Sequence, residues 1–200
     1  MSSKRVKAGA ESLSGSFRIR NLTYEMYNDA MYFKEQAKKL PTEPKYDFQR
    51  WTYLRASIIV SLIAIESFIN LFLKQHFNYL DVSTQSCLFV GNNGKPKASK
   101  LRRLPIDVKL TMGIKLVTGK TFDVTKEPYK SYKRFKKIRN DLVHFEGTSK
   151  QDRKKHNNDF TIDNAENVLK TIRSMMKKIH KFEDATPPEW IRQTRSAVIK

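Results

Sequence analysis

Cysteine is almost absent from this chain, since Cys87 is the only one in 200 residues. A single thiol cannot form a disulfide within the chain, which excludes a disulfide-held fold and fits a reducing compartment. No histidine lies near Cys87 in the sequence, so we interpret it as a small buried or half-buried residue. Hydrophobic residues make up 39% of the chain, enough for one domain to bury a core without metals or disulfides.

Patterns for metal and nucleotide sites are also missing. The four histidines, His76, His144, His156 and His180, have no cysteine or paired carboxylates at ligand spacing. The glycines of segment 91–94 lack the residues that must follow them in a phosphate-binding loop. We therefore expect no metal and no cofactor. An enzyme made from this sequence would rely on its own side chains.

Acidic residues are scarce relative to basic ones. Asp and Glu total 20 against 39 Lys and Arg, which gives a formal net charge of +19. Such an excess creates a long-range positive potential, and its usual partners are nucleic acids or anionic membranes.

Membrane association is the less favoured of these two. The apolar stretch 56–73 approaches the length of a membrane span, but it contains Glu66 and Asn70. A carboxylate there would be costly in lipid. Residues 1–15 have no apolar core of the kind found in secretion signals. We expect a soluble, cytoplasmic protein without a membrane partner.

By composition, the chain divides into an N-terminal arm, one helical domain and a short tail. Residues 1–18 are predicted to be a disordered basic arm, 19–185 the domain and 186–200 the C-terminal tail. Periodicity and breaker residues predict helices over 22–39, 47–79 (with Asp47 as cap), 107–117 (closed by Gly119), 128–145 and 163–182. The predicted fold is all-α: an up-and-down bundle of four to five helices with an inserted basic loop.

The helix predicted over 128–145 has two distinct faces. Phe135, Ile138, Leu142 and Phe145 share one stripe, while Lys133, Lys137, Asn140 and His144 share the opposite one. Arg139 falls on the flank of the apolar stripe. A helical histidine is commonly structural, and one in a last turn can favour the negative helix end. The wheel nevertheless directs His144 away from the core.

The segment 137–145, Lys-Ile-Arg-Asn-Asp-Leu-Val-His-Phe, resembles the signature of the HEPN superfamily: an arginine, a polar residue and then a histidine near the end of a late helix. Segment 64–70 is similar to the central helix of many members. The resemblance implies a HEPN-like bundle and a metal-independent endoribonuclease of the toxin or antiviral-defence type. It also implies a homodimer in which two copies of the motif form a composite active site.

The same resemblance implies roles for three residues. Arg139 would hold the scissile phosphate of a single-stranded RNA through its bidentate fork. His144 would transfer a proton at the 2′-hydroxyl or the leaving oxygen, and Asn140 would orient the imidazole or the phosphate. The products would carry 2′,3′-cyclic phosphate and 5′-hydroxyl ends, and DNA should remain uncut.

Three basic runs surround this motif and are expected to contact the RNA backbone. They comprise Lys95, Lys97, Lys100, Arg102 and Arg103; Lys130, Lys133, Arg134, Lys136 and Lys137; and Lys150, Arg153, Lys154 and Lys155. Glu66 and Asn70 are expected to support the site from the apolar helix. Glu66 either positions Arg139 or pairs elsewhere in the core, and the sequence leaves both possibilities open.

Two other functions stay open. One is a non-catalytic RNA-binding module that holds a dedicated RNA, with Arg139 as a phosphate anchor. The other is an oligomerising or regulatory helical module whose charge is incidental. If the chain is a ribonuclease, a cell must restrain it, so we expect an inhibitor, either an antitoxin protein or a bound RNA.

Overall fold

The computed structural model describes residues 22–77, 104–143 and 159–197, and these residues form helices joined by short turns. The elements, in chain order, are α1 (Leu22–Lys39), the 3₁₀ turn η1 (Pro44–Tyr46), α2 (Asp47–Phe77), α4 (Ile106–Val108), the π segment η3 (Lys109–Gly113), α5 (Ile114–Thr118), α6 (Tyr129–Val143), α8 (Ile162–Phe182) and the 3₁₀ turn η4 (Glu189–Arg192). The expected all-α class is therefore confirmed for the described part of the chain.

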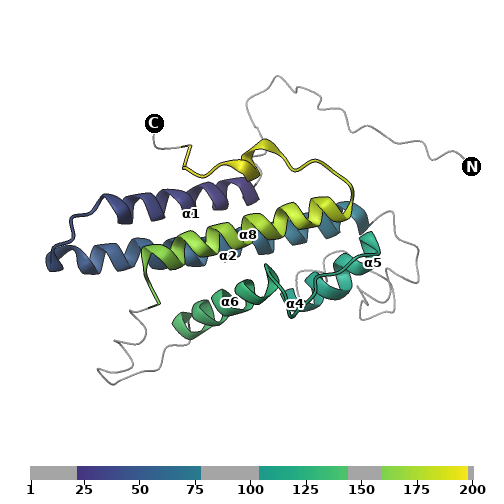
Figure 1. The fold of residues 1–200 in the computed structure, drawn as a ribbon, viewed down its shortest axis with the longest axis horizontal. Coiled ribbons are helices and arrows are strands. Elements are labelled where there is room, and N and C mark those ends of the chain that lie inside the picture. Colours follow the sequence, from purple (N-terminus) through teal and green to yellow (C-terminus); the bar gives the residue numbers. More distant parts are fainter. Residues whose placement is uncertain (1–21, 78–103, 144–158, 198–200) are drawn as a thin grey trace, which may run out of the picture.

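The long helix α2 lies at the centre of the bundle, where it contacts α1, α8 and α6. Figure 1 shows α1, α2 and α8 side by side, with α6 and the α4–α5 segment along the other side of α8. Helices α1 and α2 run antiparallel, as do α6 and α8. Small residues let α1 approach α2 closely: Ser57 is fully buried and donates a hydrogen bond to the carbonyl oxygen of Ala30 at 2.8 Å.

Apolar side chains at helical spacing form one continuous core. On α8 these are Ala165, Val168, Leu169, Ile172, Met175, Met176 and Ile179, all buried. The helix begins after Thr161, whose hydroxyl accepts a hydrogen bond from the backbone N–H of Asn164 at 3.1 Å and so satisfies a free donor of the first turn.

Of two predicted helix ends, one differs from the structure and one agrees with it. Asp47 is not the N-cap of α2, because it already has helical backbone angles and its carboxylate accepts a hydrogen bond from Arg50 at 2.6 Å. The turn η1 leads into the helix instead. Gly119 ends α5 in the left-handed conformation (φ 71°), as expected of a terminating glycine.

The segment expected to be a tail packs onto α1. Ile191 is fully buried, and Trp190 lies against the rings of Tyr24 and Tyr27 at 5.7 and 5.9 Å between centroids. The backbone N–H of Ala197 donates to the side chain of Asn28 at 2.7 Å. Residues 190–197 therefore contact the helical bundle, and the tail predicted over 186–200 is packed in its described part. The arm predicted over 1–18 lies outside the described residues.

Among the described residues, some apolar side chains of α2 remain partly exposed. By length and composition alone, the helical stretch Pro44–His76 could cross a membrane, and 56% of its most apolar window is buried inside the protein. Ile63 and Leu71 remain 37% and 41% exposed on this helix.

Candidate functional site

Helix α6 lies between α2 and α8 and carries the arginine of the motif. Tyr132, Phe135 and Ile138 are buried beneath it, at 1%, 1% and 6% exposure, whereas Lys133 and Lys137 are exposed. The predicted division of this helix into an inward apolar face and an outward basic face is confirmed over the described residues. His144 and Phe145 lie outside them.

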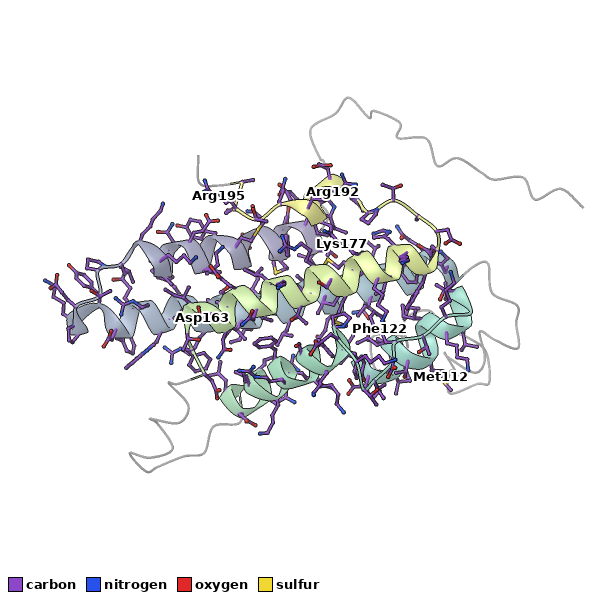
Figure 2. All side chains as sticks on the ribbon, viewed as in Figure 1. Met112, Phe122, Asp163, Lys177, Arg192 and Arg195 are labelled. Atoms are coloured by element: carbon purple, nitrogen blue, oxygen red, sulfur yellow. The ribbon has the colours of Figure 1, made fainter. Side chains whose placement is uncertain are left out.

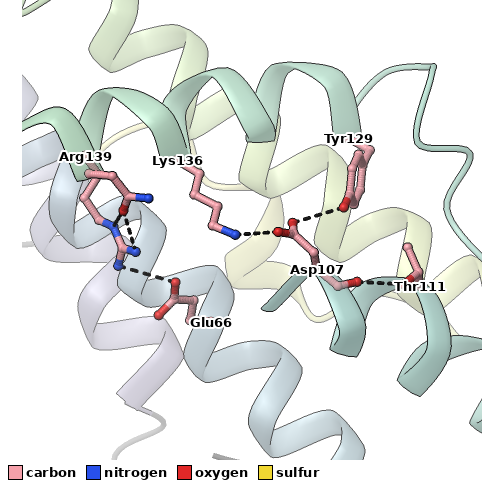
Figure 3. Close-up of polar contacts among 7 residues, drawn as sticks. Glu66, Asp107, Thr111, Tyr129, Lys136 and Arg139 are labelled. Atoms are coloured by element: carbon pink, nitrogen blue, oxygen red, sulfur yellow. Dashed lines mark hydrogen bonds and ion pairs between the residues drawn. The ribbon is translucent and has the colours of Figure 1, made fainter. Parts of the chain in front are cut away.

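Arg139 projects from α6 toward α2 and is held by two acceptors (Figure 3). Its Nη1 lies 3.5 Å from Oε1 of Glu66 on α2. Its Nε and Nη2 donate to Oδ1 of Asn140 at 3.2 and 3.0 Å. Of the two possibilities that the sequence left open for Glu66, the structure has the pairing with Arg139.

The Glu66–Arg139 pair is half-exposed, although the apolar sequence around Glu66 predicted a buried carboxylate. The two side chains are 32% and 25% exposed. An ion pair at this depth contributes little to stability, so its main effect is to fix the direction of the guanidinium. Contacts with described residues use three of the five N–H groups of Arg139 and leave one on each terminal nitrogen for an anionic ligand.

A second ion pair lies one turn earlier on α6. Asp107 of α4 accepts hydrogen bonds from Lys136 at 2.5 Å and from the Tyr129 hydroxyl at 3.0 Å (Figure 3). Burial alone would raise the pKa of Asp107, but the hydrogen bonds from Lys136 and Tyr129 outweigh it and lower this pKa. Burial and Asp107 together raise the pKa of Tyr129 to about 12. Asp107 thus stays ionised and Tyr129 neutral at physiological pH.

A buried lysine joins the π segment to α2. Lys109 of the π segment is 4% exposed and donates to Oδ1 of Asn70 at 2.8 Å. Burial lowers the pKa of Lys109, while the nearby Glu66 carboxylate raises it. Asn70 is therefore a partner of Lys109 and has no described contact with Arg139.

The hydroxyl of Tyr132 is buried and has no hydrogen-bond partner among the described residues. Burial raises its pKa, and the carboxylates of Glu66 and Asp107 raise it further, whereas Arg139 lowers it. These effects place the hydroxyl within electrostatic reach of both ion pairs. The resulting polar cluster comprises Glu66, Asn70, Asp107, Lys109, Tyr129, Tyr132, Lys136, Arg139 and Asn140.

Several lysines and arginines that were expected to contact RNA form ion pairs or hydrogen bonds with other residues of the chain. Lys136 pairs with Asp107, and Lys137 pairs with Asp141 one turn along α6 at 2.6 Å. Arg134 donates to the side chain of Asn164 at 3.1 Å. Lys130 and Lys133 are exposed. The other expected contacts, Lys95, Lys97, Lys100, Arg102, Arg103, Lys150, Arg153, Lys154 and Lys155, lie outside the described residues.

No sequence motif marks Asp107, Lys109, Tyr129 or Tyr132 as site residues. Tyr129 and Tyr132 fall on the inward side of α6, where an aromatic residue is ordinarily read as core. Asp107 and Lys109 lie among apolar residues of a short predicted helix. Charged residues in such a segment were the only sequence feature that pointed to buried polar contacts there. Within the described ranges, no group of three or more histidine, cysteine or carboxylate residues could hold a metal ion.

Comparison with protein-family models, with curated proteins and with solved structures finds no match to this chain.

Proposed function

We propose that this protein is a metal-independent endoribonuclease with Arg139 as its phosphate-binding group. The observation that carries the proposal is the placement of Arg139, which is directed by Glu66 and Asn140 and keeps N–H groups on both terminal nitrogens. The resemblance of segment 137–145 to the HEPN signature supports the same assignment.

The proposed reaction is an attack of the ribose 2′-hydroxyl on the adjacent phosphorus. The bond from phosphorus to the 5′-oxygen breaks, which leaves a 2′,3′-cyclic phosphate and a 5′-hydroxyl. His144 would take the proton from the 2′-hydroxyl or give one to the leaving oxygen. Arg139 would stabilise the charge that develops on the phosphate oxygens, because its donors are already oriented.

The neighbouring residues set the environment of Arg139. Glu66 positions the guanidinium from α2, and Asn140 does so from α6. Lys109 and Lys136 add positive charge, but the nearby carboxylates of Glu66 and Asp107 largely balance it. We propose that this balance keeps Arg139 as the principal anion-binding group of the cluster.

A homodimer with a composite site is part of the proposal. Ile63 and Leu71 expose apolar surface on α2, the helix that also carries the half-exposed Glu66. A second copy packed on this face would cover the apolar side chains and bring two Arg139 groups near one another. The RNA substrate and an antitoxin protein or inhibitory RNA complete the proposed set of partners.

A non-catalytic RNA-binding module is the second candidate. The observation in its favour is that Glu66 and Asn140 already hold Arg139, as they would hold a structural anchor. In that case Arg139 binds a phosphate of a dedicated RNA, and the RNA is not cleaved.

Cleavage of a mixed-sequence single-stranded RNA in excess EDTA tests the first proposal. We expect the wild type to leave cyclic-phosphate ends, and His144→Ala to bind RNA without cutting it. A DNA of the same sequence, which lacks the 2′-hydroxyl, is the control substrate. Tight RNA binding without cleavage by the wild type would favour the RNA-holding module.

A further inference from the structure

Four basic residues form a stripe along the outer face of α8. Lys170, Arg173, Lys177 and Lys181 are spaced three or four residues apart, so they recur about every 5 Å on one side of the helix. The three lysines are exposed and Arg173 is half-buried. No acidic residue occurs in α8 after Glu166.

The α8 stripe differs from the basic residues of α6 in its ion pairing. Lys136 and Lys137 of α6 are each paired with a carboxylate. Lys170, Lys177 and Lys181 form no ion pair with any residue in the described ranges. Their charge is therefore available to an external anion.

The one carboxylate beside the start of the stripe is already paired. Glu166 accepts a hydrogen bond from Lys38 of α1, and that hydrogen bond lowers its pKa. The pKa of Lys34 on the same side is lowered first by burial and further by the charges of Lys38 and Arg173, while Glu35 and Glu166 raise it. Lys34, Lys38 and Arg173 therefore lie near one another between α1 and α8, with Glu35 and Glu166 beside them.

Two hollows flank the first half of the stripe. One, of about 490 Å³, lies between α6 and α8, with Arg134, Ser131 and Thr171 in its wall. The other, of about 360 Å³, lies between α1, α8 and the C-terminal segment, with Lys34 and Thr194 in its wall. Asn167 and Lys170 line both. Figure 2 shows α8 between α1 and α6, with Lys177 further along it.

We propose that the outer face of α8 binds single-stranded RNA, with phosphates along the Lys170–Lys181 stripe and bases in the two flanking hollows. This face is separate from the Arg139 site, because Arg134 of α6 contacts α8 whereas Arg139 contacts α2. The inference rests on the proposed function for RNA as the ligand.

The chemistry of the face matches a single strand. Unstacked bases can enter polar hollows and hydrogen-bond through their edges, while a duplex keeps its bases stacked inside. Both hollows fall in the range of about 300–1,000 Å³ that is usual for ligand sites. Hydroxyl and amide groups of Ser131, Asn167 and Thr171 provide donors and acceptors there.

The test is a binding titration of the full-length chain with a fluorescein-labelled 2′-O-methyl oligouridylate, which the proposed reaction cannot cut. The variant K170Q/K177Q removes two charges from the stripe. Its matched control, K74Q/K115Q, removes two from exposed positions on α2 and α5. We expect K170Q/K177Q to weaken binding about tenfold and to reduce the slope of log K against log salt by about 1.4, while the control stays near the wild type.

The other outcomes overturn the proposal. If both variants lost the same amount of affinity for the oligouridylate, only the net charge of the protein would matter for binding. If the wild type did not bind the oligouridylate, α8 would not be an RNA-binding face. Equal binding of a duplex would exclude the base-accepting hollows. Binding to phosphatidylserine vesicles, lost in K170Q/K177Q, without RNA binding would make this a membrane-facing surface. Failure of cleavage in EDTA leaves the α8 inference unaffected, because the oligouridylate measures binding alone.

Discussion

Glu66, in the middle of α2, lies 3.5 Å from Arg139, near the end of α6. These residues are 73 positions apart in the sequence, so the direction of Arg139 depends on the packing of the whole bundle. Glu66 does not contact a bound phosphate in the proposed reaction. We therefore assign it as a positioning residue.

Replacing Glu66 by Gln should slow RNA cleavage about tenfold to a hundredfold, because a loosely placed guanidinium stabilises the reacting phosphate less well. The Km for RNA should change little, since the α8 face and other basic residues supply most of the binding. Unfolding of E66Q should differ from the wild type by no more than about 1 kcal/mol, because the pair is half-exposed. Steady-state kinetics and urea unfolding measure these quantities.

Arg139→Lys provides the companion variant to E66Q. A lysine keeps the charge but lacks the planar fork, so cleavage should fall nearly as far as in Arg139→Ala, by about a hundredfold or more. Full activity in R139K would show that a point charge suffices, and that result would contradict the role given to Glu66.

Sequence periodicity predicted the helices well because it reports burial within one helix at a time. The inward positions Phe135 and Ile138 follow directly from their spacing. The partner of Lys136 could not be predicted in this way, because Asp107 lies 29 residues earlier and meets it only after α4 packs beside α6. For the same reason the polar cluster around Arg139 was only partly predicted. Packing of the 186–197 segment was missed because single aromatic and apolar residues there show no period.

Asp107→Asn should destabilise the fold by about 1 kcal/mol at neutral pH, because Lys136 loses a charged partner while much of the site stays hydrated. The pKa of Asp107 is lowered in the folded protein. Its stabilising effect is therefore present above the unfolded pKa of about 4 and is lost as pH falls through the lower folded pKa. Urea unfolding at a series of pH values should show the two proteins converging in acid.

Asp141→Asn is the matched control for Asp107→Asn. Asp141 pairs with Lys137 on the exposed side of α6, and such a pair contributes only about 0.3–0.5 kcal/mol. A loss in D141N as large as that in D107N would contradict the importance assigned to the partly buried pair.

His180 should make the protein sensitive to mild acid. Burial lowers its pKa, and neither ring nitrogen has a hydrogen-bond partner among the described residues, while the ring lies against Phe68 with centroids 5.5 Å apart. Below about pH 6.5 the imidazole takes up a proton in the unfolded chain but stays neutral in the folded protein. The free energy of unfolding therefore decreases as the pH is lowered. His180→Phe should lose less stability than the wild type between neutral pH and pH 5. Parallel curves for the two proteins would contradict this assignment.

Charging the exposed face of α2 should disrupt the proposed homodimer. In Ile63→Lys/Leu71→Lys, two lysines would replace side chains that are 37% and 41% exposed in the single chain. If a second copy covers this face, burying those charges is costly, so light scattering after size-exclusion chromatography should shift from dimer to monomer. Met112→Lys alters a side chain that is 51% exposed on η3 and should remain dimeric.

Because a composite site needs both copies, the monomeric variant should also lose cleavage while it keeps RNA binding through α8. The composite arrangement would be contradicted if the wild type were a monomer. It would also be contradicted if the variant with both lysines remained a dimer, because the exposed residues of α2 would then not form the interface.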